Sequence, residues 1–180
     1  RPGWYTCACC PPNVVRLLMS LGKYLWSETE DGVYSHIPAG TEAHFDKMDV
    51  TVESNYPWDG RVIYHVTGKT EKETILGIHI PSWVRPGSVQ VRINGKVKDI
   101  TADVEKGYLI LKRVWENDEV ELVFPMKIRK IYANLKVRED AGCVAFMRGP
   151  FVYCFEGVDN PGLLQSYHIF EDAKMEEEVC

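Results

Sequence analysis

The feature that most constrains the fold of this chain is a period of two in its apolar residues, which begins after Gly32. Such alternation places every second side chain on one face of an extended segment, as in a half-buried β-strand. Asn94–Gly95 separates two of these segments and is a strong signal for a two-residue hairpin turn. The clearest runs are RVIYHVTG (61–68), TILGIHIP (74–81), SVQVRING (88–95), GYLILKRVW (107–115) and DEVELVFPM (118–126), and further strands are predicted at 33–37, 48–54, 128–133 and 142–156. We therefore predict a mainly β fold, an antiparallel β-sandwich.

One helix is predicted ahead of the strands, from about Pro12 to Ser27. In the segment PPNVVRLLMSLGKYLWSE, apolar residues recur at three- and four-residue spacing, and two prolines occupy the first turn, where a missing N–H costs little. The stripe is broad enough to require packing partners on two sides of the helix. The remainder of the chain offers few such partners, so we expect the natural packing partners of this helix to be missing from the chain. The chain also begins with Arg1 and stops just after an acidic run, which we interpret as one part of a longer polypeptide.

Composition excludes several classes of function. The chain has 180 residues and a net charge of −5, and it contains no block rich in lysine and arginine, so no nucleic-acid partner is expected. No apolar run approaches the ~20 residues that span a bilayer, so no membrane partner is expected either. Six cysteines are too few for a small disulfide scaffold, and Cys143 and Cys154 lie in apolar strand-like runs that suggest buried thiols. A reducing, cytoplasmic location is the corresponding prediction.

The segment CACCPPN (7–13) concentrates three of the cysteines at the start of the predicted helix. Cys7 and Cys10 form a C-x-x-C pair, but redox pairs of this kind occur beside βαβ units, which the sequence lacks. Thiolates also bind zinc, usually as part of a set of four ligands. A thiolate held at a helix start could instead act as a nucleophile. The alternative is a purely structural role for three packed cysteines, and residue chemistry alone leaves these interpretations open.

Aromatic residues of the predicted sandwich offer a second candidate site. Trp58, Trp83 and Trp115 could together form a platform for stacking a sugar ring. Packing in the core or in loops is the more common role of tryptophan in such a fold, and we favour it here.

The chain resembles the retaining β-L-arabinofuranosidases of glycoside hydrolase family 127. The resemblance rests on CACCPPNVVRLL (7–18), YPWDG (56–60), IPSWV (80–84), GYLILKRVW (107–115) and RGPFVYCFEGVDN (148–160), which occur in the order found in the family. Family members have a large (α/α)6 barrel followed by β-sandwich domains. By this resemblance, residues 1–27 would be the end of the barrel, 28–125 a β-sandwich, and 126–180 further strands that extend it or begin a second sandwich.

The resemblance also implies the roles of two cysteines. Cys9 would be the catalytic nucleophile and a zinc ligand, and Cys10 would be a second zinc ligand. The glutamate that acts as general acid/base, a further glutamate and a further cysteine of the zinc site lie upstream of this motif in the family. The longer protein would then bind zinc and hydrolyse terminal L-arabinofuranosyl residues of an arabinose-containing glycan.

For the 180-residue chain itself, we expect no activity and absent or incomplete zinc binding. We also expect self-association through surface that a barrel would otherwise cover. The alternative function is a non-catalytic β-sandwich module that binds carbohydrate or packs on a catalytic domain.

Overall fold

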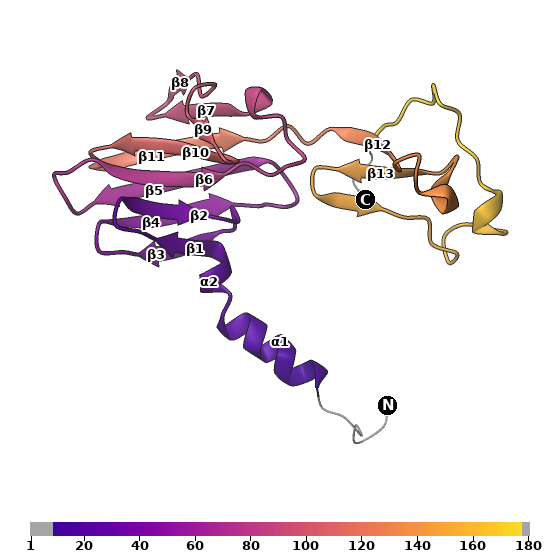
Figure 1. The fold of residues 1–180 in the computed structure, drawn as a ribbon, viewed down its shortest axis with the longest axis horizontal. Coiled ribbons are helices and arrows are strands. Elements are labelled where there is room, and N and C mark those ends of the chain that lie inside the picture. The colour runs from indigo at the N-terminus through magenta and orange to yellow at the C-terminus, as the bar shows by residue number, and fades with distance from the viewer. Residues whose placement is uncertain (1–8, 178–180) are drawn as a thin grey trace. The chain divides into compact units, whose positions relative to one another are not determined.

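The computed structural model describes residues 9–177 and divides the chain into two compact units, with the division between Phe124 and Pro125 (Figure 1). The first unit contains two short α-helices and two β-sheets, and the second is built on one three-stranded sheet. The mainly β prediction is confirmed. None of the helices within residues 9–177 is long and apolar enough to cross a membrane.

The two sheets of the first unit form a sandwich. The five-stranded sheet contains, in spatial order, β1 (Trp26–Glu28), β2 (Gly32–Ser35), β6 (Thr74–His79), β10 (Tyr108–Arg113) and β9 (Val104–Glu105). The six-stranded sheet contains β3 (Thr41–His44), β4 (Met48–Ser54), β5 (Arg61–Gly68), β11 (Asn117–Val123), β7 (Gln90–Ile93) and β8 (Lys96–Lys98), and a 3-10 turn at Pro86–Ser88 precedes β7. Their inward side chains form one apolar core.

Strand pairing is antiparallel, as predicted, except between β2 and β6. These two strands run parallel, with Val33 opposite Leu76 and Ser35 opposite Ile78. The chain leaves the five-stranded sheet after β2, builds β3, β4 and β5 in the other sheet, and then returns as β6. An excursion through the opposite sheet brings β6 back in the direction of β2, and the local alternation of residues carries no information on that direction.

The predicted alternation is visible in the burial of the central strands. Along β4, Val50 and Val52 are buried while Thr51 is exposed, and along β11 Val120 and Leu122 are buried on either side of a less buried residue. The predicted hairpin turn is also confirmed: Asn94 and Gly95 both have positive φ, 50° and 74°, as a two-residue turn between β7 and β8 requires.

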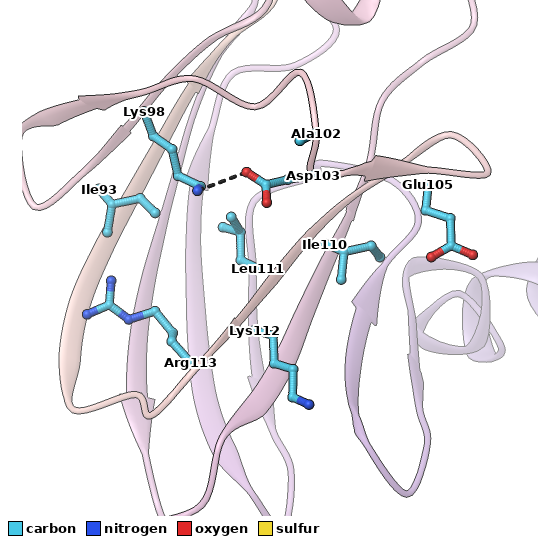
Figure 2. A pocket seen from close by; sticks show the side chains of 9 residues that line it. All are labelled: Ile93, Lys98, Ala102, Asp103, Glu105, Ile110, Leu111, Lys112 and Arg113. Atoms are coloured by element: carbon cyan, nitrogen blue, oxygen red, sulfur yellow. Dashed lines mark ion pairs between the residues drawn. The ribbon is translucent and has the colours of Figure 1, made fainter.

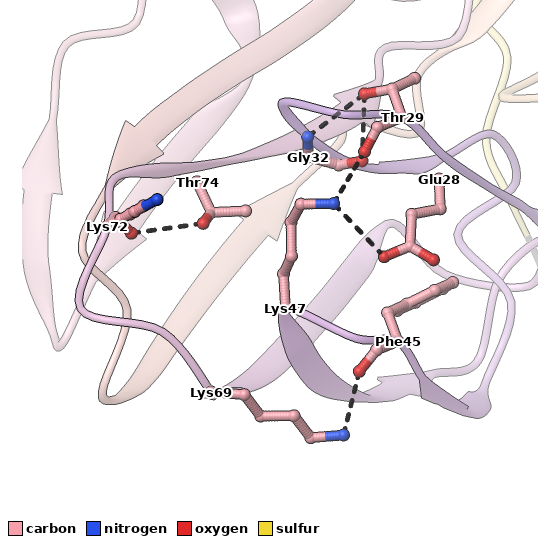
Figure 3. Close-up of polar contacts among 8 residues, drawn as sticks. All are labelled: Glu28, Thr29, Gly32, Phe45, Lys47, Lys69, Lys72 and Thr74. Atoms are coloured by element: carbon pink, nitrogen blue, oxygen red, sulfur yellow. Dashed lines mark hydrogen bonds and ion pairs between the residues drawn. The ribbon is translucent and has the colours of Figure 1, made fainter.

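Lysine side chains fasten the loops at one end of the sandwich (Figure 3). Lys47 Nζ donates a hydrogen bond to the carbonyl oxygen of Thr29 at 3.0 Å and lies 3.8 Å from a carboxylate oxygen of Glu28. Lys69 Nζ donates to the carbonyl oxygen of Phe45 at 3.0 Å. The contact between Lys47 and Thr29 joins a loop of the six-stranded sheet to the β1–β2 turn of the five-stranded sheet, which helps to hold the two layers in register.

The helix prediction for Pro12–Ser27 is wrong at a break at residues 20–21 and at its end, residues 26–27. Helix α1 spans Cys10–Met19, a separate turn α2 spans Gly22–Leu25, and the chain then becomes strand β1 at Trp26. The hydroxyl of Ser20 bonds back to two carbonyl oxygens of the last turn of α1, which ends that helix. Trp26 is buried in the sandwich, and its indole Nε1 donates to Thr41 Oγ1 at 3.2 Å, so tertiary packing selects the extended backbone there.

The second unit contains β12 (Ile128–Tyr132), β13 (Val144–Arg148) and β14 (Phe151–Tyr153), with 3-10 turns at Arg138–Asp140 and Leu164–Ser166. The predicted strand 142–156 is therefore two strands. A turn at Gly149, whose φ is 54°, separates them. Lys130 Nζ donates to the backbone carbonyls of Phe170, Glu171 and Ala173 and so fastens the C-terminal segment to this sheet.

Candidate functional site

Two of the predicted site residues, Cys9 and Cys10, lie together where helix α1 begins. Their sulfur atoms are 3.5 Å apart, and both side chains are exposed. The side-chain amide of Asn13 and its backbone N–H both donate to the carbonyl oxygen of Cys9, at 2.8 and 3.3 Å. Arg16 Nη1 in turn donates to Asn13 Oδ1 at 3.1 Å. The first turn of α1 thus holds the backbone that carries both thiols, while Cys7 lies outside the described residues.

Two adjacent thiols can serve as soft metal ligands or present a nucleophile, since thiolates suit both kinds of chemistry. Within residues 9–177, no group of three or more histidine, cysteine or acidic side chains lies close enough to hold a metal ion. In the described part of the chain, Cys9 and Cys10 therefore have no third metal-ligating side chain close by, and a four-ligand zinc site that used them would need donors from elsewhere.

The prediction that Cys143 and Cys154 are buried is wrong. Cys143 and Cys154 are exposed, because Cys143 precedes β13 and Cys154 follows β14, so neither sits at an inward position of a strand. Both line hollows of the second unit. The one that includes Cys143 measures about 750 Å³, and the one that includes Cys154 about 510 Å³.

The three tryptophans do not form a shared stacking platform. Trp115 is buried, with its indole Nε1 donating to the carbonyl oxygen of Thr74 at 2.8 Å. Trp83 is partly buried and packs against Phe124, with ring centroids 6.3 Å apart. Trp58 has an exposed fraction of 66%. The burial of Trp115 agrees with the packing role that we favoured for these residues.

A hollow of about 580 Å³ lies at the open edge of the sandwich, beside β10 (Figure 2). Lys98 and Asp103 form an ion pair of 2.8 Å across it, and Arg113 at its other end pairs with Asp118 at 3.0 Å. Since these charges are already compensated within the protein, the hollow offers little unsatisfied polar chemistry to a ligand. Neither Cys9 nor Cys10 lines it.

The five histidines are scattered along the sequence with no metal-ligand spacing, yet the fold brings two of them together. His36 and His79 both contact Tyr108, with ring centroids 5.8 and 5.2 Å away. Burial and the neighbouring His79 lower the pKa of His36 below its ordinary value. The signal in the sequence is strand alternation, which places Tyr34, His79 and Tyr108 on the outer faces of their strands. That these strands are neighbours is known only from the structure.

Comparison with known proteins identifies the family of this chain. A model of the "Beta-L-arabinofuranosidase, GH127 middle domain" matches residues 32–126, and a model of the "Glycoside hydrolase family 127 C-terminal domain" matches residues 128–179. The chain belongs to glycoside hydrolase family 127. The two matched GH127 domains meet close to the division between the two compact units.

Relatives support the same assignment. A non-reducing end β-L-arabinofuranosidase of Bifidobacterium longum subsp. longum is 40% identical over 176 residues, which cover 94% of this chain and 26% of the relative. The crystal structure of a GH127 β-L-arabinofuranosidase from Geobacillus stearothermophilus T6 aligns with a TM-score of 0.79 and 44% identity, over 89% of this chain and 26% of that one. Another GH127 β-arabinofuranosidase structure aligns with a TM-score of 0.75 and 36% identity, over 89% of this chain and 28% of that one. The chain thus spans about a quarter of the length of these GH127 relatives.

Proposed function

We propose that this chain functions within a longer GH127 glycosidase that removes terminal β-L-arabinofuranosyl residues from an arabinose-containing glycan. The observation that carries the proposal is the exposed pair of thiols at the start of α1, with sulfur atoms 3.5 Å apart, on a chain 40% identical to a named β-L-arabinofuranosidase. The nucleophile is Cys9.

The reaction follows the retaining scheme. Cys9 Sγ attacks the anomeric carbon and forms a C–S bond while the glycosidic C–O bond breaks, and a carboxylic acid protonates the leaving oxygen. Water, deprotonated by the same carboxylate, then displaces the sulfur and releases the sugar with its original anomeric configuration. The carboxylic acid and the remaining zinc ligands are expected from the part of the longer enzyme that precedes this chain.

The thiols fit zinc as two of its ligands, because thiolate sulfur is among the donors that zinc prefers. Cys9 and Cys10 would hold the metal, and zinc, when bound, would keep the attacking thiol in its thiolate form near neutral pH. Two thiolates leave half of a tetrahedral ligand set unfilled, so the 180-residue chain should bind zinc weakly and show no hydrolysis.

The test compares the longer enzyme with the 180-residue chain on an aryl β-L-arabinofuranoside, with metal content measured on both. We expect Cys9→Ser in the longer enzyme to lower kcat by at least about a thousandfold, because an alcohol is hardly ionised near neutral pH. Cys143→Ser is the matched control, since Cys143 is also an exposed free cysteine, and it should leave kcat unchanged. Full activity of the Cys9→Ser variant, or robust hydrolysis by the 180-residue chain, contradicts the proposal.

We further propose that the 180-residue chain self-associates when it is isolated. Helix α1 has no buried residues, and its apolar side chains are widely exposed, with Leu18 at 63% and Met19 at 84%. Exposed apolar surface of this kind favours association. Sedimentation velocity should show a dimer or larger species that Leu18→Ser weakens, and a monomer at all concentrations would contradict this expectation.

A further inference from the structure

The outer face of the five-stranded sheet carries a group of aromatic and polar side chains that the proposed reaction does not use. Strand alternation directs them outward, because their neighbours Val33, Ile78 and Leu109 are buried in the core. We call this group the tyrosine–histidine face, and its members are Ser27 of β1, Tyr34 of β2, His36 just after β2, His79 of β6 and Tyr108 of β10.

The position of Tyr34 depends on a glycine in the next strand. Tyr34 is opposite Gly77 in the β2–β6 pairing. A Cβ on Gly77 would lie 2.3 Å from Cδ1 and 2.6 Å from Cε1 of Tyr34, closer than real Cβ atoms approach. The tyrosine ring therefore lies across the sheet in space that any other residue at position 77 would fill.

Tyr108 stands beside this ring at nearly a right angle. The two ring planes make an angle of 83°, with centroids 5.8 Å apart. Since the Tyr34 ring lies across the sheet, the nearly perpendicular Tyr108 ring stands out from the sheet beside it. The ring plane of His36 makes an angle of 86° with that of Tyr108, and the ring plane of His79 makes an angle of 51° with it. The result is an aromatic corner with imidazoles around it, and all four side chains are partly exposed.

The polar atoms of the corner form one connected chain. Ser27 Oγ is 2.9 Å from His36 Nε2, and His36 Nδ1 is 2.7 Å from the hydroxyl of Tyr108. A neutral imidazole donates one of these bonds and accepts the other, which leaves each hydroxyl with capacity for a further bond. Because the pKa of His36 is lowered by burial and by His79, the imidazole stays uncharged near neutral pH. Ser27, His36 and Tyr108 therefore offer uncharged donors and acceptors, which suit a neutral, hydroxyl-rich ligand better than an ion.

We propose that the tyrosine–histidine face is a binding site for one sugar unit of a glycan, with the C–H face of the sugar packed on Tyr34 and its hydroxyls bonded by Ser27, His79 and Tyr108. An aromatic ring buries the apolar face of a sugar, and hydroxyl and imidazole groups satisfy its polar edge. That the sugar is an arabinofuranosyl unit rests on the proposed function. A second point of attachment raises the local concentration of the same glycan at the protein.

A purely structural role is the competing explanation. Aromatic rings that cover a glycine also stabilise sheets, and the face could be covered by another part of a longer protein. The two explanations differ in what a soluble sugar does to the ring signals of the face.

The chain contains five histidines, which supply an internal control. NMR spectra of the imidazole Cε1–H signals are recorded while the 180-residue chain is titrated with methyl β-L-arabinofuranoside and with an arabino-oligosaccharide. The signals of His36 and His79 should shift in a saturable way at millimolar sugar. The signals of His44, His65 and His168 should stay in place.

Variants of Tyr34 then test whether its ring contributes to sugar binding. Tyr34→Ala should weaken binding about tenfold, a change of ~1.4 kcal/mol, whereas Tyr34→Phe keeps the ring and should bind like the wild type. Phe170→Ala is the matched control, since Phe170 is an aromatic residue of the second unit with an exposed fraction of 83%. It should leave the affinity unchanged.

The proposal is overturned if neither sugar shifts His36 and His79, if all five histidines shift alike, or if Tyr34→Ala binds as well as the wild type. If Tyr34→Ala does not fold, the titrations of the wild-type chain and of Tyr34→Phe still distinguish sugar binding from a purely structural role. Binding by the 180-residue chain needs no hydrolysis. Cys9→Ser should therefore abolish turnover in the longer enzyme without changing this titration, and each of the two proposals can fail alone.

Discussion

Replacing Asp118 should destabilise the sandwich more than replacing an exposed acidic residue would, because this carboxylate joins the β7–β8 turn to the connection between β10 and β11. Asp118 is buried, with an exposed fraction of 6%. It accepts hydrogen bonds from Asn94 Nδ2 at 2.8 Å, in the β7–β8 turn, and from the backbone N–H of Glu116 at 3.0 Å. It also pairs at 3.0 Å with Arg113 of β10, in the other sheet.

The magnitude follows from what Asp118→Ala leaves behind. Two donors that faced a carboxylate lose their acceptor, and hydrogen bonds to a charged group contribute about 1.5 kcal/mol or more each. The guanidinium of Arg113 is two-fifths exposed, so water can solvate it, and the lost ion pair adds only about 0.5 kcal/mol. We expect Asp118→Ala to lower the free energy of unfolding of the first unit by about 3 to 4 kcal/mol, and its Tm by about 10 °C.

Urea unfolding followed by tryptophan fluorescence measures this loss, because all five tryptophans precede residue 125 and report on the first unit. Asp103→Ala is the matched control. Asp103 also pairs with a lysine, Lys98, at 2.8 Å, but both side chains are about one-third exposed (Figure 2). The control should change the free energy of unfolding by about 0.5 kcal/mol.

Equal and small losses for the two aspartate variants would refute the reasoning, since burial and the number of partners would then not set the cost. A loss below about 1 kcal/mol for Asp118→Ala would do the same, because it is smaller than the contribution of one hydrogen bond to a charged group.

Three further outcomes are expected. Tyr64→Phe removes the 3.0 Å bond between the buried tyrosine hydroxyl and Ser35, and should cost about 1 to 2 kcal/mol in urea unfolding. Adding Ser35→Ala to that variant should cost less than the sum of the single changes, and strict additivity would contradict the bond. Gly68→Ala would place a Cβ 1.9 Å from the carbonyl oxygen of Trp115 and should cost about 3 kcal/mol, whereas an unchanged Tm would show that the strands can separate there. Burial lowers the pKa of His36, so the unfolded chain takes up a proton at higher pH than the folded chain. The free energy of unfolding should therefore fall as the pH drops below about 6.5, and His36→Gln should reduce that fall; an identical pH profile would contradict it.

Strands β4 and β11 show how much of the fold local sequence can predict. The side chains of each strand alternate between buried and exposed because one face of the strand packs on the core. This period can be recognised from a few consecutive residues. The turn at Asn94–Gly95 is equally local, since its positive φ angles depend on these two residue types. The position of Cys9 and Cys10 at a helix start was likewise predictable from the two prolines that follow them.

The end of the N-terminal helix was not predictable in the same way. The apolar spacing continues through Leu25, yet Trp26 is buried among Phe45 and Tyr64, with ring centroids 5.6 and 6.3 Å from theirs. Those partners lie far along the chain, in the loop after β3 and in β5. Burial of one large side chain by distant residues therefore overrides a helical pattern that local spacing alone supports.

By itself, the sequence determined the central strands of the sandwich and which cysteines share a helix end, because period, turn chemistry and proline placement act over a few residues. Only the tertiary structure decided which strands are neighbours, including the parallel pair β2–β6, because pairing depends on contacts between distant segments. The tyrosine–histidine face belongs to this second class. His36 and Tyr108 are 72 positions apart, and they share a 2.7 Å hydrogen bond because the return of the chain through the opposite sheet places β2, β6 and β10 side by side.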